Sequence, residues 1–330
     1  KFEEKYKELQ PEKYKDTIEH VIKKGNTPAG MHISIMVNEI LDFLKIQPGE
    51  TGFDATLGYG GHTKAMLQCL NGQGHIYATD VDPEESARTR KRLEEAGFGE
   101  DILTIRLQNF CTIDEIAKEA GGFDFILADL GVSSMQIDNP KRGFSFKVDG
   151  PLDLRLNQEA GISAAERLAA ITKDELAGML YENSDEPYCE ELAKAITDEI
   201  RKGSRIDTTT KLRNIIEKTL DFLPEKEKKD TIKKTCQRTF QALRIDVNRE
   251  FEVLYEFMEK LPDALKPGGR AAILTFHSGE DKLVKKALKE GYRAGIYADY
   301  AKDVIRPSAQ ECAQNGRARS TKMRWAIKAE

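Results

Sequence analysis

The chain has 330 residues, of which 39% are hydrophobic and 32% are charged. This length and apolar content allow a buried core and exclude wholesale disorder. No apolar run reaches the roughly 18 residues of a membrane span, and the charged N-terminal residues do not resemble a secretory signal. The net charge is −5, so a polyanionic partner would have to meet a local basic patch. Five widely spaced cysteines without a CxxC pair favour a reducing, cytoplasmic environment.

The first part of the chain alternates predicted strands and helices. Residues 1–30 are expected to form an N-terminal helical extension, and residues 33–46 predict a second helix. Strands are expected within residues 51–62, 74–82, 102–110 and 123–131, with helices between them. This alternation is typical of an α/β fold with a doubly wound, Rossmann-like parallel sheet.

The alternation stops near residue 138. Residues 138–240 predict an inserted all-helical domain for substrate recognition, with helices at 163–171, 173–183, 189–203 and 209–220. The α/β pattern then resumes, with one long helix at 240–265 and strands at 268–278 and 321–329. The sheet domain is therefore expected to comprise residues 31–137 and 241–330.

The strongest local signal is the glycine-rich sequence DATLGYGGH at residues 54–62, between an expected strand and an expected helix. Gly58, Gly60 and Gly61 allow a ligand to approach the backbone closely, and the helix N-terminus supplies N–H donors. Asp80 ends the next expected strand, where a carboxylate is placed to accept hydrogen bonds from both ribose hydroxyls of an adenosine.

This spacing suits either NAD or S-adenosylmethionine. A dinucleotide fingerprint requires a third glycine near position 63, but Thr63 stands there. Asp54, just before the glycines, suits the ammonium group of a methionine tail better than a pyrophosphate. S-adenosylmethionine is therefore the favoured cofactor, with an ordinary glycine turn of an α/β fold as the alternative.

The fourth expected strand is almost entirely apolar and ends at Asp129. Ligands of open α/β sheets bind beyond the carboxyl ends of the strands. Asp129, Ser133, Ser134 and Gln136 are therefore expected to face the reactive end of the cofactor. The alternative for Asp129 is a helix N-cap or a turn carboxylate.

Together, these motifs resemble the RsmH (MraW) family of small-subunit ribosomal RNA methyltransferases. The matches follow one order along most of the chain. They are residues 54–62 (DATLGYGGH), 80–83 (DVDP), 129–134 (DLGVSS) with Gln136, 142–146 (RGFSF), 150–156 (GPLDLRL), 239–248 (TFQALRIDVN), 268–270 (GGR), 276–285 (FHSGEDKLVK) and 315–324 (NGRARSTKMR). The resemblance implies an S-adenosylmethionine-dependent methyltransferase domain with an inserted helical domain. The implied activity is methylation of the N4 amine of a cytosine in the decoding centre.

The resemblance also assigns cofactor-binding positions. They are Gly60, Gly61, His62, Asp80, Phe110, Asp129 and Gln136. A phenylalanine at the end of the third expected strand would pack on adenine, although a plain core phenylalanine is the alternative. The departures from the family pattern, among them Met135 for the usual Pro and Gly279 for the usual Leu, gather on the substrate side.

The catalytic hypothesis follows from the chemistry of the amine. Its lone pair is delocalised into the ring, so the enzyme must position it and accept one of its hydrogen bonds. Asp129 is the expected acceptor, with Ser133 or Ser134 beside it. The base must leave its stack to enter the site.

Substrate contacts are expected from Asp153, Arg155 and His277. The alternatives are a structural ion pair for the first two and a hydrogen-bonded histidine at a strand end for the third. Basic residues in 225–249 and in 315–324, the latter including Arg317 and Arg319, predict RNA contacts. No metal site is expected, because no set of ligands has suitable spacing, and an oxygen-ligated Mg²⁺ is the alternative.

The expected partner is small-subunit ribosomal RNA, within an assembled small subunit because the net charge disfavours naked RNA. Other readings are a paralogue of the same fold acting on another RNA or a small acceptor, and a non-catalytic RNA-binding assembly factor. An NAD oxidoreductase is the most distant. The sequence leaves the oligomeric state open, a homodimer included.

Overall fold

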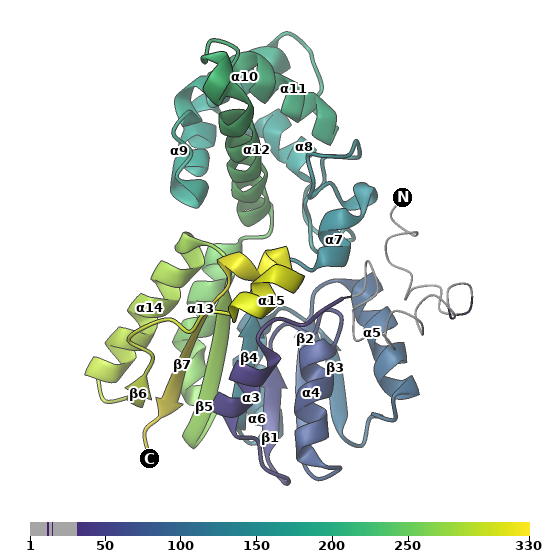
Figure 1. The fold of residues 1–330 in the computed structure, drawn as a ribbon, viewed down its shortest axis with the longest axis vertical. Helices are drawn as coiled ribbons and strands as arrows, with labels where there is room; N and C mark the ends of the chain where they lie inside the picture. The colour runs from purple at the N-terminus through teal and green to yellow at the C-terminus, as the bar shows by residue number, and fades with distance from the viewer. Residues whose placement is uncertain (1–11, 13–14, 16–31) are drawn as a thin grey trace. The chain divides into compact units, whose positions relative to one another are not determined.

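The computed structural model describes residues 12, 15 and 32–330, which divide between two compact units. The sheet unit contains Ile33–Gly131 and Phe251–Glu330, and the helical unit contains Val132–Glu250 (Figure 1). The expected N-terminal extension, residues 1–30, lies almost wholly outside the described residues. The structure puts the unit boundaries at Val132 and Glu250, where the sequence suggested residues 138 and 240.

The sheet unit is built on a seven-stranded sheet in the order β3-β2-β1-β4-β5-β7-β6. Its strands are β1 (Thr51–Asp54), β2 (His75–Asp80), β3 (Leu103–Leu107), β4 (Phe123–Asp129), β5 (Leu265–Thr275), β6 (Tyr297–Tyr300) and β7 (Lys322–Lys328). The strands from β3 to β5 are parallel, as the α/β pattern predicts. β7, whose direction the sequence did not predict, runs antiparallel to both β5 and β6.

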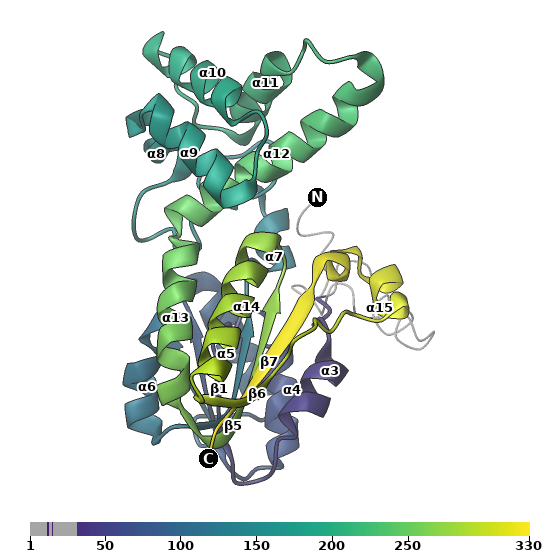
Figure 2. The same ribbon diagram turned by 90° about the vertical axis from the view of Figure 1, so that its left-hand side faces the viewer.

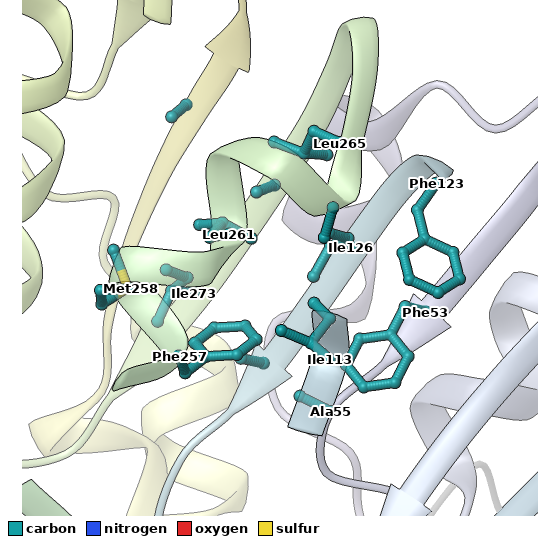
Figure 3. Packing of buried hydrophobic residues seen from close by; sticks show 14 of the residues in the cluster. Phe53, Ala55, Ile113, Phe123, Ile126, Phe257, Met258, Leu261, Leu265 and Ile273 are labelled. Atoms are coloured by element: carbon teal, nitrogen blue, oxygen red, sulfur yellow. The ribbon is translucent and has the colours of Figure 1, made fainter. Parts of the chain in front are cut away.

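Both faces of the sheet are covered by helices. The helices are α3 (Val37–Leu44), α4 (Gly61–Leu70), α5 (Pro83–Glu95), α6 (Ile113–Ala120), α14 (Ser278–Arg293), the short α15 (Ala309–Gln314), and α13 (Glu250–Ala264), whose first residue belongs to the helical unit. On one face, α6, α13 and α14 pack on the sheet (Figure 2), and Figure 3 shows Phe257 and Met258 of α13 in this core. On the other face, α3, α4 and α5 bury a second core. Successive residues of β4 point to opposite faces of the sheet: Ile126 packs in the first core and Leu127 in the second. Because both faces are buried, the sequence of β4 is almost entirely apolar.

The helical unit has a core of its own. Its main helices are α8 (Ala164–Ala170), α9 (Lys173–Ser184), α10 (Cys189–Arg201), α11 (Thr209–Thr219) and α12 (Glu225–Val247), after the short α7 (Ser134–Asp138). The first four match the expected helices. Ser163 and Thr172 close capping boxes, and Thr208 caps α11, because its hydroxyl accepts the Lys211 N–H at 3.2 Å.

The expected helix over residues 240–265 is instead the end of α12 followed by α13. The chain breaks between them at Arg249, whose φ of 50° lies in the left-handed region. The last turns of α12 bury Phe240 and Leu243 in the core of the helical unit, so this unit extends beyond residue 240. In the described part of the chain, no helix combines the length and apolar character needed to cross a bilayer.

Candidate functional site

The glycine-rich turn leads from β1 into α4, as the sequence predicts. Gly60 has a φ of 89°, and a Cβ built on it would lie 2.6 Å from a methyl carbon of Thr89. A Cβ on Gly61 would lie 1.8 Å from the hydroxyl oxygen of Ser34. α4 begins at Gly61. The residue before it, Gly60, has a left-handed backbone conformation and no side chain to cap the first N–H groups of the helix. The glycines therefore let this turn pack closely against Thr89 and Ser34.

Asp80 stands at the carboxyl end of β2 and touches this turn. Its Oδ2 accepts the N–H of Gly58 at 2.8 Å, and its Oδ1 accepts the N–H of Asp82 at 2.9 Å. Burial raises the pKa of Asp80 to about 6, although the two backbone hydrogen bonds oppose the rise. The structure thus brings together the turn and the carboxylate that the sequence paired by spacing. A carboxylate oxygen has a further lone pair for a ribose hydroxyl.

Asp54 differs from its expected role. It is fully buried, and its oxygens accept the N–H of Thr56 at 3.0 Å and the hydroxyl of Thr63. Burial raises its pKa. A fully buried side chain presents no surface to an ammonium group, so this geometry does not support direct contact with a methionine tail. Thr63, at the position where a dinucleotide fingerprint has glycine, instead ties α4 to the end of β1.

His62 and Asp129 form a buried pair beside this turn. His62 is 7% exposed, its Nε2 lies 2.7 Å from the Ile35 carbonyl oxygen, and its Nδ1 lies 3.4 Å from Asp129 Oδ2. The Asp129 N–H donates to the Thr56 hydroxyl at 2.7 Å, which fixes the end of β4 against the end of β1. Asp54 also acts on His62 through its charge. No spacing rule in the sequence links a residue of α4 to the end of β4, so this pair was missed.

Phe110 follows β3 and begins a short 3₁₀ helix, Phe110–Thr112. Its ring is partly buried and meets the Phe257 ring edge to face, with centroids 5.2 Å apart and planes at 88°. One side of the ring therefore belongs to the core. The rest of the Phe110 ring is partly exposed, as the predicted contact with adenine requires.

Ser133, Ser134 and Gln136 lie in α7 of the helical unit or at its cap. The Ser133 hydroxyl accepts the Gln136 N–H at 3.1 Å, and Gln136 Oε1 accepts the Ser133 N–H at 2.9 Å. This reciprocal arrangement is a capping box, with Ser134 as the first residue of the helix. The Ser133 side chain and the Oε1 atom of Gln136 therefore have a structural function, because they cap α7.

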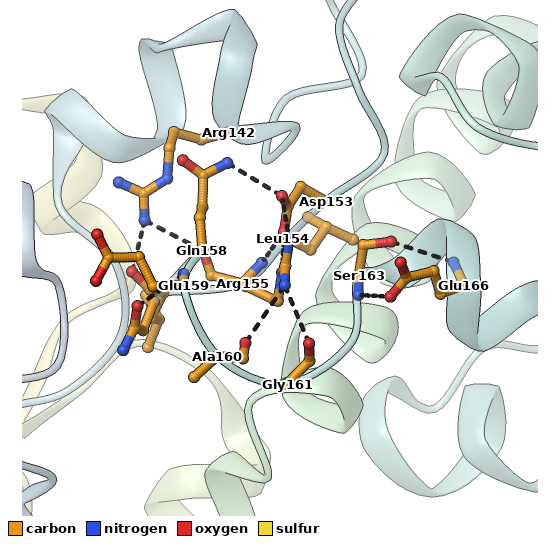
Figure 4. A network of polar contacts seen from close by, with 12 residues as sticks. Arg142, Asp153, Leu154, Arg155, Gln158, Glu159, Ala160, Gly161, Ser163 and Glu166 are labelled. Atoms are coloured by element: carbon orange, nitrogen blue, oxygen red, sulfur yellow. Dashed lines mark hydrogen bonds and ion pairs between the residues drawn. The ribbon is translucent and has the colours of Figure 1, made fainter.

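Asp153 and Arg155 form a two-pronged ion pair within the helical unit (Figure 4). Arg155 Nε donates to Asp153 Oδ1 at 2.8 Å and Nη2 donates to Oδ2 at 3.1 Å, while Gln158 donates to the same carboxylate. Although burial opposes it, these donors lower the pKa of Asp153. Leu154, between the two, has a φ of 65° and hydrogen-bonds through its carbonyl to Asn248. The geometry is that of a structural ion pair, which is the alternative to a substrate contact for these residues.

His277 caps α14 in the sheet unit. Its Nε2 lies 3.2 Å from Glu280 Oε1, and its ring meets that of Phe251 at a centroid distance of 5.8 Å. A Cβ on Gly279 would lie 2.6 Å from a ring carbon of Phe251. The glycine that departs from the family pattern thus makes room for Phe251, and His277 matches the alternative of a hydrogen-bonded histidine at a strand end.

The basic C-terminal sequence contains both buried and exposed residues. Arg324 is 4% exposed and holds Asp281 through Nε at 2.8 Å, and Lys322 lies 3.5 Å from the same carboxylate. These two belong to an internal ion-pair cluster, so the expectation that they join an RNA-binding patch is wrong for Arg324. Arg319 is exposed and Arg317 is partly buried.

The fold and this site define the class of the protein. An α/β sheet with an antiparallel strand at one edge, a glycine turn after β1 and a carboxylate at the end of β2 are the features expected of a methyltransferase that uses S-adenosylmethionine. The chemistry of this set of groups, a carboxylate beside the first turn of a helix, fits that cofactor.

Comparison with known proteins identifies the family. A family model described as the MraW methylase family matches residues 29–329, and the chain belongs to this family. Ribosomal RNA small subunit methyltransferase H 1 of Agathobacter rectalis is 87% identical over 330 residues, covering 100% of this chain and 95% of the relative. The protein of the same name from Lachnoclostridium phytofermentans is 71% identical, covering 99% and 90%. Ribosomal RNA small subunit methyltransferase H 2 of Alkaliphilus metalliredigens is 64% identical, covering 99% and 94%.

Proposed function

We propose that the chain methylates the N4 amine of a cytosine in the decoding centre of small-subunit ribosomal RNA. The supporting observation is similarity over nearly the whole of both chains to relatives named as methyltransferases of this RNA. The family model also spans both the sheet unit and the helical unit. With a net charge of −5, the chain is suited to an assembled small subunit in the cytoplasm, where ribosomal proteins screen the RNA.

The residues around the glycine turn would hold the cofactor, which supplies an electrophilic methyl group when bound. Asp80 would accept hydrogen bonds from ribose hydroxyls, and the backbone at Gly60 and Gly61 would lie against the methionine part. The partly exposed Phe110 ring would pack on adenine. Asp54 acts indirectly in this scheme, because it holds Thr56 and Thr63 in place.

Asp129 would accept a hydrogen bond from the cytosine amine. This contact localises the nitrogen lone pair and stabilises the positive charge that develops on nitrogen as the new bond forms. The amine loses its proton readily once methylated, so a strong base is unnecessary. Asp129 is suited to this task because its side chain is about a quarter exposed at a strand end and held by fixed neighbours.

The test is methyl transfer from labelled S-adenosylmethionine to small subunits that lack the modification, followed by nucleoside mass spectrometry. We expect N4-methylcytidine at one site. Label on another RNA in a parallel panel would instead support a paralogue of the same fold. Cofactor binding without label on any RNA would support a non-catalytic assembly factor.

A further inference from the structure

Both ring nitrogens of His62 face hydrogen-bond acceptors. Nε2 lies 2.7 Å from the carbonyl oxygen of Ile35, and Nδ1 lies 3.4 Å from the carboxylate of Asp129. A carbonyl oxygen never donates, and an ionised carboxylate does not either. A neutral imidazole has only one N–H, so it would turn a lone pair towards one of these oxygens. We propose that His62 is an imidazolium that donates in both directions and positions Asp129 for methyl transfer.

The charges around His62 support this protonation state. Asp129 reaches it from the end of β4 and Asp54 acts on it from the end of β1, while the segment before α3 contributes the Ile35 carbonyl. Burial lowers the pKa of His62, but the hydrogen bond and charge of Asp129, the Ile35 carbonyl and the charge of Asp54 together raise it to about 9. Because His62 is 7% exposed, solvent ions screen these interactions little.

The pairing has a consequence for Asp129. The contact with Nδ1 fixes one oxygen of this carboxylate, which leaves the other available as an acceptor. Loss of one His62 proton would turn a nitrogen lone pair towards either the Ile35 carbonyl or the Asp129 carboxylate, and the ring would then hold Asp129 less firmly. This consequence rests on the proposed function, and it predicts that methyl transfer falls as the pH rises through about 9.

The first experiment follows the imidazole nitrogens directly by NMR on the whole chain labelled with ¹⁵N-histidine. We expect both His62 nitrogens to be protonated at about pH 7, and Asp129→Asn to lower the titration midpoint by about one to three pH units. His75 is the matched control, because its Nε2 lies 2.7 Å from the Thr104 hydroxyl, which is able to donate or accept. Its signals should not respond to Asp129→Asn. A single protonated nitrogen on His62 at pH 7 would overturn the proposal.

The second experiment compares the pH profiles of kcat for the wild type and His62→Gln. Glutamine offers its N–H donors from one atom only, so we expect kcat to fall at least tenfold and the decline near pH 9 to disappear, with KM for S-adenosylmethionine changed less. A variant that keeps the alkaline decline would contradict the positioning role. If no RNA accepts a methyl group, the proposed function fails, whereas the NMR titration still decides the protonation state. Should His62→Gln not fold, His75→Gln and Asp129→Asn assign the NMR signals.

Discussion

The sheet unit and the helical unit use their motif residues differently. In the sheet unit, the motif carboxylates Asp54, Asp80 and Asp129 end three strands around one glycine turn, and burial raises the pKa of the first two. In the helical unit, motif residues satisfy the chain itself. Ser133 and Gln136 close a capping box, and Asp153 holds Arg155.

This difference shows what a sequence motif reports. A motif marks residues whose neighbours are fixed. In the helical unit those neighbours belong to the chain, whereas for Asp80 and Asp129 in the sheet unit we propose a ligand. Exposed lone pairs at strand ends favour a ligand, whereas reciprocal hydrogen bonds within a few residues favour a structural function. Substitutions in each unit separate the two functions.

The largest effect is expected at Asp129. Asp129→Ala removes the proposed acceptor and should lower methyl transfer at least about 100-fold. Because the side chain is partly exposed, the fold should persist, as judged by circular dichroism and by retained cofactor binding. The measurement is single-turnover methylation of small subunits. Normal turnover would remove Asp129 from the mechanism.

The glycine turn should be nearly as sensitive. In Gly61→Ala, the new Cβ would overlap the Ser34 hydroxyl, which is 1.8 Å from its place, and overpacking should cost about 1–3 kcal/mol in the free energy of unfolding. Calorimetry should also show weaker S-adenosylmethionine binding. Adding Ser34→Ala removes the overlapping atom and should restore part of both quantities. If the second substitution restores nothing, the close approach is not the cause.

The ion pair in the helical unit should affect stability but not cofactor binding. Arg155→Met leaves Asp153 without its two-pronged partner and should lower the free energy of unfolding by about 1–3 kcal/mol near pH 7. The pKa of Asp153 is lowered in the folded state, so the stability it contributes is present above its unfolded value and is lost as the pH falls through the folded value. The deficit of the variant should therefore shrink in acid. Weaker S-adenosylmethionine binding in Arg155→Met would assign this pair to the cofactor site after all.

Asp80 predicts a pH dependence of cofactor binding in the sheet unit. Its pKa is about 6, and the ionised form is the better acceptor for ribose hydroxyls. Affinity for S-adenosylmethionine should therefore fall about tenfold between pH 7.5 and pH 5, as the carboxylate is protonated. Asp80→Asn should bind weakly at both pH values and lose the dependence. An unchanged slope in this variant would place the titrating group elsewhere.

The sequence predicts most of the fold because long apolar strands and capped helices carry local signals. β4 and the helices α8–α11 are of this kind. β6 was missed because it has only four residues, two of them exposed, and owes its place to pairing with β7. The break at Arg249 was missed because no glycine or proline marks it.

The site was predicted in part, for a related reason. The pairing of Gly58 with Asp80 follows from a spacing rule, so it was found. The burial of Asp54 and the contact of His62 with Asp129 depend on how three strands lie side by side, which no local pattern encodes. The sequence therefore predicted where these residues lie in the chain's elements better than it predicted which groups they contact.

The smallest effect is expected from the basic residues of the C-terminal motif, and it bears on which unit binds RNA. Arg317→Ala with Arg319→Ala should weaken RNA binding about threefold to tenfold and reduce the salt slope of binding by about one for each phosphate that the variant no longer neutralises. The matched variant in the helical unit replaces two exposed residues of α12, Lys226 and Lys229, with alanine. Arg324→Met is a third comparison. It breaks the buried pair with Asp281, so it should lower stability more than RNA affinity. If the α12 variant alone changes the salt slope, the helical unit binds the phosphates, and the C-terminal motif serves mainly to hold β7 and α14 together.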